Sequence, residues 1–191
     1  DREEAGSPNV VGAVAMAAAA QLLMRRGMAE IAAQEMALTA YALEQLQQVP
    51  DLILYGDTAP ANVADRVGVI PFNLKGIHHA LVAAILGYEG GIGVRNGCFC
   101  AHPYVVHLLK LNPTEQQGWQ QEILAGDKSR MPGMVRVSLG CLNTRADIDH
   151  LVAMLRRITC GEILGDYRVD RATGDYYPVN HDDGLHNYFA L

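Results

Sequence analysis

The sequence predicts an α+β fold in which helices cover a mostly antiparallel sheet. Strand-like and helix-like segments follow one another without the strict alternation that builds a parallel sheet. Residues 135–142 alternate between apolar and polar or small side chains, which is typical of a strand with one buried face. Residues 145–158 instead repeat apolar side chains at helical spacing. These two patterns are the clearest indication of a sheet packed under helices.

The composition is that of a globular protein with one sizeable core and room for an appendage. Of the 191 residues, 50% are hydrophobic and 19% are charged. A net charge of −6 gives no electrostatic reason to expect a nucleic acid partner. The apolar run over residues 10–24 is too short for a membrane span, which takes roughly 18 residues, so we expect no membrane association. Four cysteines do not indicate a disulfide framework, and we expect a reduced, cytoplasmic setting.

Two helices are predicted on either side of Gly27. Ser7 is a typical N-cap and Pro8 a typical first helical residue, so the first helix is expected to start there and to stop at Gly27. Because this helix is apolar on nearly every side, we expect it to be buried all round. A second helix is predicted over residues 28–48, ended by Pro50.

The middle of the chain predicts short strands around one helix. Residues 52–55 and 66–73 are strand candidates, and Pro71 implies an edge position or a bulge because it lacks an N–H. A helix is predicted over residues 77–87, followed by a short strand over residues 91–95.

The remaining segments differ in regularity. Residues 104–133 show no clear period. Thr144 and Asp147 resemble a capping box before the last helix, with Asp in place of the usual Glu. Residues 167–169 and 176–179 are predicted to form a hairpin.

A glycine-containing loop is the most informative segment for chemistry. It presents Cys98 and Cys100 beside Arg95 and His102. A nearby positive charge lowers the pKa of a thiol and favours the nucleophilic thiolate, although a buried structural cysteine in a turn gives the same pattern. Cysteine and histidine at this spacing are not a usual zinc motif, so we expect no metal site.

Arg136 and Ser7 are weaker candidates for binding. The planar guanidinium of Arg136 suits a carboxylate, whereas a lone outward arginine is more often only solvated. Ser7 stands at a helix start, where free N–H groups favour a phosphate, but most serines there only cap the helix. His78 and His79 are taken as ordinary first-turn residues without an assigned role.

Five segments, in order, resemble the C-terminal half of class V aminotransferase-fold enzymes that depend on pyridoxal phosphate (PLP), closest to the cysteine desulfurase and selenocysteine lyase branch. They are residues 4–9 (EAGSPN), 69–73 (VIPFN), 76–86, 91–103 (GIGVRNGCFCAHP) and 135–144. The resemblance covers roughly residues 2–158. It implies the C-terminal small domain of a fold-type I PLP-dependent transferase over residues 1–160, with the first helix bridging from a large domain. Residues 161–191 then form a C-terminal extension.

The resemblance also implies site residues. Cys100 falls on the nucleophile that takes sulfur from PLP-bound cysteine as a persulfide, and Arg136 on the arginine that holds the substrate carboxylate. Arg95 would line the same pocket. Ser7 falls on the hydroxyl that reaches the PLP phosphate of the partner subunit in a homodimer. PLP, an amino-acid substrate and a sulfur-acceptor protein are the implied cofactor and partners.

Departures from the family pattern limit what this chain does alone. The PLP lysine of the family usually follows a histidine, whereas Lys75 and Lys110 follow leucines and Lys128 follows Asp127. We therefore expect the chain alone to be inactive and not to hold PLP covalently. It begins at Asp1 rather than Met, so we expect a piece of a longer protein. Phe99 replaces a histidine common before the nucleophile.

Three hypotheses remain for the intact protein. In the first, it removes sulfur or selenium from a cysteine-type amino acid, with Cys100 as nucleophile. In the second, it is a PLP-dependent aminotransferase or lyase of the same fold that does not use Cys100. In the third, the chain is a non-enzymatic interaction module.

Overall fold

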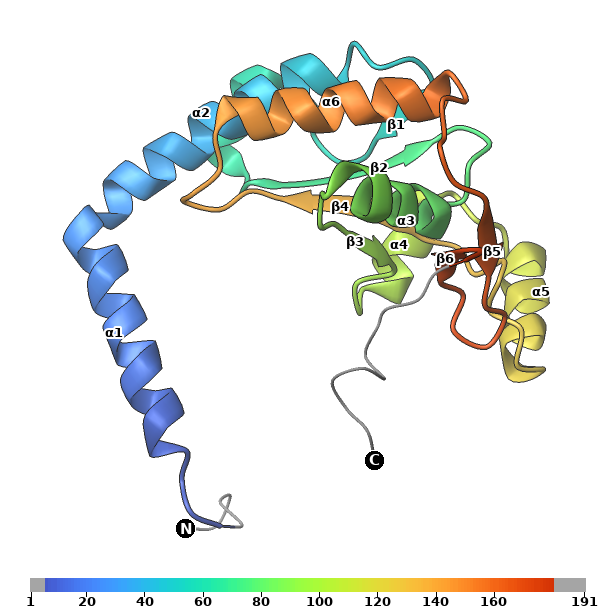
Figure 1. Ribbon diagram of the computed structural model, residues 1–191, viewed down its shortest axis with the longest axis horizontal. Coiled ribbons are helices and arrows are strands. Elements are labelled where there is room, and N and C mark those ends of the chain that lie inside the picture. Colours follow the sequence, from blue (N-terminus) through green and yellow to red (C-terminus); the bar gives the residue numbers. More distant parts are fainter. Residues whose placement is uncertain (1–5, 181–191) are drawn as a thin grey trace.

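The computed structural model describes residues 6–180, which form a four-stranded sheet under helices and a separate C-terminal hairpin (Figure 1). Residues 4 and 5 of the segment 4–9 therefore lie outside the described part. The elements in chain order are α1 (Val10–Arg26), α2 (Met28–Leu46), β1 (Leu52–Leu54), a 3-10 helix η1 (Pro60–Asp65), β2 (Val69–Leu74), α3 (His79–Gly90), β3 (Arg95–Gly97), α4 (His102–Leu108), α5 (Pro113–Leu124), β4 (Met134–Ser138), α6 (Arg145–Thr159), β5 (Tyr167–Val169) and β6 (Tyr176–Pro178).

The sheet has the strand order β1-β2-β4-β3, and every neighbouring pair is antiparallel. In β2, Ile70, Phe72 and Leu74 face the core and are 0–2% exposed, while the residues between them face away. The helices α2, α3 and α6, with Val135 and Val137 of β4 and Val49 after α2, supply the rest of this core. The α+β fold with an antiparallel sheet covered by helices is thus confirmed.

The last helix forms as its pattern predicts. Asp147 accepts a hydrogen bond from the backbone N–H of Thr144 at 2.7 Å, the half of a capping box that closes the helix start. The apolar stripe of α6 is buried against α2 and α3, so this helix depends on burial more than on intrinsic propensity. Its buried residues are Ile148, Leu151, Val152, Met154, Leu155 and Ile158. The predicted C-terminal hairpin also forms, as β5 and β6.

Two predictions about α1 are wrong. Its N-cap is Asn9, which accepts a hydrogen bond from the N–H of Gly12 at 2.8 Å, and Ser7 lies outside the helix. The helix ends at Gly27 as expected, but none of its residues is buried, and Val11 is 81% exposed. Helix α1 extends away from the sheet (Figure 1) and has only a few contacts with α2. An apolar helix can be buried only where a partner surface exists, and the described chain provides none for α1.

Pro71 lies in β2, an interior strand, where an edge position or a bulge was expected. The chain tolerates it because β1 ends next to it. The carbonyl of Pro71 accepts a hydrogen bond from the N–H of Tyr55, directly after β1. The second hydrogen bond of this residue pair would need an N–H on Pro71, which proline lacks, but the pair stands at the end of the β1–β2 pairing. The interior strand is therefore an edge on one side at this residue.

Several boundaries also differ from expectation. Residues 91–94 are not a strand, because Gly91 ends α3 in a left-handed conformation at φ 63° and pairing starts only at Arg95. The stretch 104–133 contains most of α4 and all of α5. Helix α5 carries a capping box between Asn112 and Glu115, with Pro113 at its first position, so the sequence does contain start signals for this helix.

A buried histidine ties the N-terminus of α3 to the segment before β4. The ring of His79 is 6% exposed, with Nε2 at 2.9 Å from the carbonyl oxygen of Met131 and Nδ1 at 3.2 Å from Oδ1 of Asn96. His78 Nε2 lies 3.1 Å from the same Met131 oxygen. Burial, with the neighbouring His78, lowers the pKa of His79 to about 4.

Replacing Phe72 and Val11 by alanine should separate the core from α1. Phe72→Ala should lower the free energy of unfolding by about 3–5 kcal/mol, because it empties a fully buried position. Val11→Ala should change it by no more than about 0.5 kcal/mol, because that side chain is exposed. Urea unfolding followed by circular dichroism measures both values. An equal loss in the two variants would contradict the exposed placement of α1.

His79 should make stability depend on pH between about 6.5 and 4. The folded pKa is lowered, so the unfolded chain takes up a proton in this window and the folded chain does not. The contribution of His79 is therefore complete above pH 6.5 and is lost as the pH falls towards 4. When the pH falls from 7 to 4.5, the unfolding free energy of His79→Gln should decrease by roughly 2–3 kcal/mol less than that of the unchanged chain. Parallel losses in both proteins, measured by urea unfolding, would refute this assignment.

Candidate active site

The loop after β3 presents Cys100 to solvent. Phe99 and Cys100 both have left-handed backbone conformations, with φ of 53° and 59°, and a hydrogen bond from Ala101 N–H to the Cys98 carbonyl closes the turn at 2.8 Å. Cys100 is exposed, whereas Cys98, two residues earlier, is buried. The turn therefore gives its two thiols opposite environments.

Cys98 acts as an anchor of this turn. Its thiol donates a hydrogen bond to the carbonyl oxygen of Pro132 at 3.2 Å, and its side chain packs with Val105 and Met134. Burial raises the pKa of the Cys98 thiol, so the group stays protonated and able to donate. These contacts fit a structural role for Cys98 and leave Cys100 as the accessible thiol of this turn.

Arg136 lies next to the same loop. It sits in the middle of β4, on the face opposite the buried Val135 and Val137. The guanidinium carbon is 5.1 Å from the centroid of the Phe99 ring, a cation–π distance. Its Nε is buried without a hydrogen-bond partner in the described structure. The loop that carries Cys100 and the strand that carries Arg136 thus converge through Phe99.

Arg95 and Arg136 are direct neighbours across β3 and β4. Two positive side chains at opposed positions of an antiparallel pair repel one another. Within residues 6–180, neither of them forms an ion pair with a carboxylate. The two arginines together therefore favour an anion at this face of the sheet.

Ser7 is not brought together with these residues. It is exposed and precedes α1, whose N-terminal end lies far from the sheet (Figure 1). Asn9, not Ser7, occupies the helix cap. Within one chain, Ser7 therefore contributes nothing to the space shared by Cys100 and Arg136.

Two hollows adjoin the site, and both involve residues that the sequence patterns did not indicate. One of about 700 Å³ borders Pro71, the neighbour of Arg136 in the sheet, and is lined by Tyr55, Arg66 and Tyr104 among others. The other, of about 440 Å³, lies between α4 and α5 and is lined by Cys98, His102 and Trp119 among others. The residues that line each hollow come from separate segments of the sequence, so no local sequence motif indicates either hollow.

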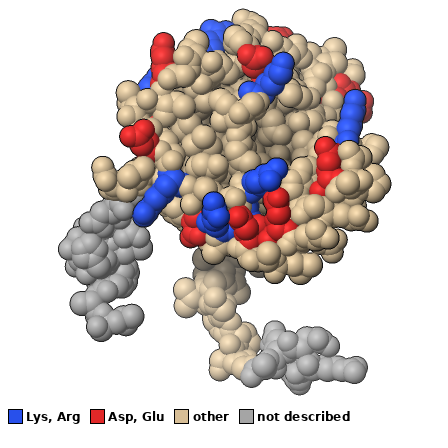
Figure 2. Space-filling model, turned by 90° about the vertical axis from the view of Figure 1, so that its right-hand side faces the viewer, with Lys and Arg blue, Asp and Glu red and all other residues tan. Residues whose placement is uncertain are grey.

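Surface charge and metal-ligating side chains give no further indication of what this site binds. On the face shown in Figure 2, basic and acidic side chains are interspersed rather than gathered by sign. Among the described residues, no cluster of His, Cys, Asp and Glu is suited to a metal ion. Within the same residues, no helix is long and apolar enough to cross a membrane.

The fit to PLP is partial. The chain supplies a thiol, two guanidinium groups and a distant hydroxyl, but PLP also needs a lysine amine for its aldehyde. Lys75 lies in the turn after β2, Lys110 follows α4, and the backbone N–H of Lys128 bonds to the carbonyl of Arg171 in the C-terminal hairpin. None of the three belongs to the loop or the strands that carry Cys100 and Arg136.

Known proteins with similar sequences include cysteine desulfurases. Cysteine desulfurases of Yersinia pseudotuberculosis serotype O:1b (strain IP 31758) and Klebsiella pneumoniae (strain 342) are 38% and 39% identical to this chain over 157 residues. The match covers 82% of this chain and 32% of each relative, so the chain spans about a third of their length.

Solved structures show the same fold. An apo structure of a cysteine desulfurase from Thermococcus onnurineus NA1 matches 84% of this chain and 34% of its own length, with a TM-score of 0.65 and 29% identity. A cysteine desulfurase from Escherichia coli matches with a TM-score of 0.60, and at 23% identity it supports the fold alone. The family model "Aminotransferase class-V" matches residues 1–151. The resemblance seen in the motifs is thereby confirmed, and the chain belongs to the class-V aminotransferase family.

Proposed function

We propose that this chain is the C-terminal part of a PLP-dependent enzyme that removes sulfur or selenium from a cysteine-type amino acid. The observation that carries the proposal is the contact between the Phe99 ring and the Arg136 guanidinium, because it places an anion-binding group beside the loop of an exposed thiol. The names of the relatives support the same chemistry.

In this proposal Arg136 binds the substrate carboxylate. A guanidinium donates two parallel N–H hydrogen bonds to the two oxygens of a carboxylate in a planar arrangement. The Phe99 ring restrains the guanidinium, and Arg95 adds a second positive charge from the neighbouring strand. Binding an anion there also offsets the repulsion between the two arginines.

Cys100 acts as the sulfur acceptor. Its thiolate attacks the substrate sulfur, so a new S–S bond forms on Cys100 as the substrate C–S bond breaks. The electron pair of the broken bond goes to the substrate carbon, which takes up a proton to give alanine when the substrate is cysteine. PLP, when bound, supplies the electron sink that makes the substrate reactive. The solvent exposure of Cys100 leaves the persulfide accessible to a sulfur-acceptor protein.

The remaining parts of the active site belong to other polypeptide in this proposal. Residues 1–160 correspond to the small domain, with α1 bridging to a large domain that carries the PLP lysine. The exposed apolar surface of α1, which includes Val11 and Met24, suits such a contact. In a homodimer, Ser7 reaches the PLP phosphate of the partner subunit, which accounts for its distance from Cys100 within one chain. Residues 161–191 form an extension to this domain.

Replacing Cys100 tests the proposed reaction. In the complete enzyme loaded with PLP, Cys100→Ala should reduce sulfide release from cysteine by at least ~100-fold, because the sulfur then has no acceptor. Cys160→Ala is the matched control, since Cys160 is also an exposed cysteine but lies at the end of α6. Unchanged turnover of Cys100→Ala would rule out the assigned role. Formation of a new amino acid from an added keto acid would then favour transamination.

Replacing Arg136 tests substrate binding separately. Arg136→Lys should raise KM for cysteine by about 10- to 100-fold, because lysine keeps the charge and loses the paired hydrogen bonds. Steady-state kinetics with Arg156→Lys, on the exposed side of α6, provides the control. If KM stays the same in both variants, another group binds the carboxylate.

A further inference from the structure

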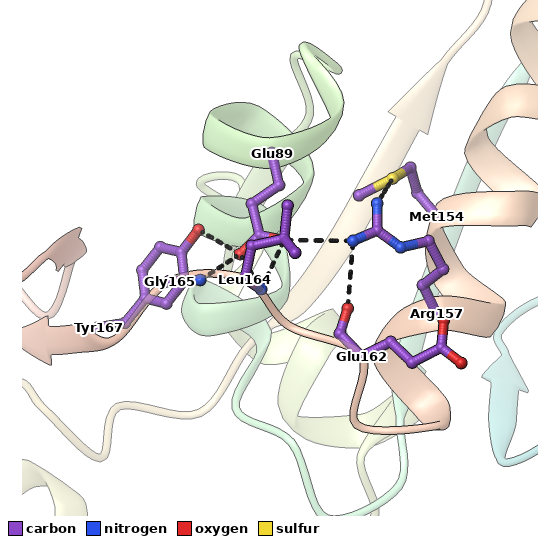
Figure 3. A network of polar contacts seen from close by, with 7 residues as sticks. All are labelled: Glu89, Met154, Arg157, Glu162, Leu164, Gly165 and Tyr167. Atoms are coloured by element: carbon purple, nitrogen blue, oxygen red, sulfur yellow. Dashed lines mark hydrogen bonds and ion pairs between the residues drawn. The ribbon is translucent and has the colours of Figure 1, made fainter.

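The C-terminal tail is anchored to α3 by a carboxylate (Figure 3). The side chain of Glu89 is 7% exposed and accepts hydrogen bonds, each of 3.1 Å, from the N–H groups of Leu164 and Gly165 and from the Tyr167 hydroxyl. Arg157, on α6, lies 3.7 Å from the same carboxylate. Burial alone raises the pKa of Glu89, but these donors outweigh it and hold the pKa below its usual range. The charged Glu89 carboxylate therefore fixes the segment that starts the hairpin.

The hairpin in turn contacts residues 127–133, which connect α5 to β4 and are called the connector below. The N–H of Lys128 donates to the carbonyl of Arg171 at 2.7 Å, and Arg171 forms an ion pair with Asp127 at 3.8 Å. Gly174 is buried at φ 84°, and a Cβ there would meet the Lys128 carbonyl oxygen at 2.8 Å. Only glycine allows the hairpin to lie this close to the connector.

The connector then holds the turn over residues 98–101, called the cysteine loop below. Pro132 accepts the hydrogen bond of the Cys98 thiol, and Gly133 packs so closely that a Cβ would lie 2.6 Å from the Cα of Gly97. The carbonyl of Met131, the residue before Pro132, lies within hydrogen-bond distance of both His78 and His79. Three successive connector residues thus fix β3, its loop and the N-terminus of α3.

We propose that the β5–β6 hairpin and the connector form one brace that positions the cysteine loop. The stretch 104–133 and the tail after residue 160, which have no counterpart among the recognised motifs, would then share a single task. The loop needs such support because Phe99 and Cys100 both adopt left-handed backbone, which is unfavourable for residues other than glycine. Cys98 is a positioning residue in this arrangement. Such a brace positions the loop whatever reaction the site carries out.

The buried Cys98 thiol reports on the brace. In the braced state it is 7% exposed and donates to Pro132, so a thiol reagent reaches it only when the loop opens. Loosening the hairpin should therefore speed the alkylation of Cys98, because the hairpin holds the connector and the connector holds this thiol. Free N-acetylcysteine serves as the reference for intrinsic reagent reactivity, because Cys100 lies in the loop under test.

The test uses the 191-residue chain with Cys141→Ser and Cys160→Ser, so that only Cys98 and Cys100 react with iodoacetamide. Gly174→Ala forces the hairpin away from Lys128. Gly27→Ala imposes similar backbone strain, since its φ is 93°, but its Cβ would meet nothing within 4 Å. Peptide mass spectrometry should show Cys98 alkylated ~10-fold faster in Gly174→Ala than in Gly27→Ala. Equal Cys98 rates in the two variants would overturn the proposal.

A milder variant decides the matter if Gly174→Ala fails to fold. Tyr167→Phe removes one donor to Glu89 without backbone strain, and circular dichroism establishes that it is folded. Cys98 should then react about threefold faster than in the unchanged background, because losing one hydrogen bond weakens the anchor by a small amount. An unaltered rate in folded Tyr167→Phe, together with failure of Gly174→Ala to fold, would count against the brace.

Replacing Cys98 distinguishes positioning from general stability. Cys98→Ser keeps a donor for the Pro132 carbonyl, and Cys98→Ala removes it. At a fixed pH, the rate of Cys100 alkylation should therefore stay close to that of the unchanged background in Cys98→Ser and change in Cys98→Ala, so the conservative variant rescues the loop. Equal rates in all three proteins would show that Cys98 does not position the loop.

Discussion

The pairing of β2 with β4 is the constraint on which the rest of the structure depends. It places Ile70 and Phe72 of β2 and Val135 and Val137 of β4 on the core face, where α2, α3 and α6 cover them. The same alternation turns Arg136 to the opposite face. A slip of one residue would drive this guanidinium into the apolar core and expose Val135 and Val137 instead. Burial of the core thus fixes the position of the arginine as firmly as any direct contact does.

Support for the cysteine loop comes from contacts distant in sequence. The left-handed backbone of Phe99 and Cys100 is unfavourable in isolation, and the contacts that offset it come from residues 131–136, more than 30 positions later. Cys98 secures one side of the turn through Pro132, and Phe99 secures the other through Arg136. The exposed thiol between them therefore owes its position to both neighbours, and its accessibility does not require a flexible loop.

The sequence predicted the features that local chemistry determines. The capping box of Thr144 and Asp147, the stripe of α6 and the hairpin need only neighbouring residues, and all three form. The prediction that α1 is buried was wrong because burial depends on a partner surface. The N-cap is Asn9 rather than Ser7, because several residues before α1 are able to cap it. The bond from His79 to Met131 joins residues 52 positions apart, so no periodicity indicates it. The family motifs indicated Cys100 and Arg136 as candidates, whereas the hollows and the proposed brace join segments far apart in the sequence, so no local motif indicates them.

The arrangement of charges favours an anion-binding role for the sheet face that carries Arg95 and Arg136. Arg95 and Arg136 face each other across one antiparallel pair, and no carboxylate of the described chain neutralises them. A sheet that places two like charges side by side loses stability unless a counter-charge arrives from elsewhere. In the proposed function, a bound substrate carboxylate supplies that counter-charge. On that proposal, the repulsion that weakens the free domain strengthens substrate binding, next to the exposed thiol of Cys100.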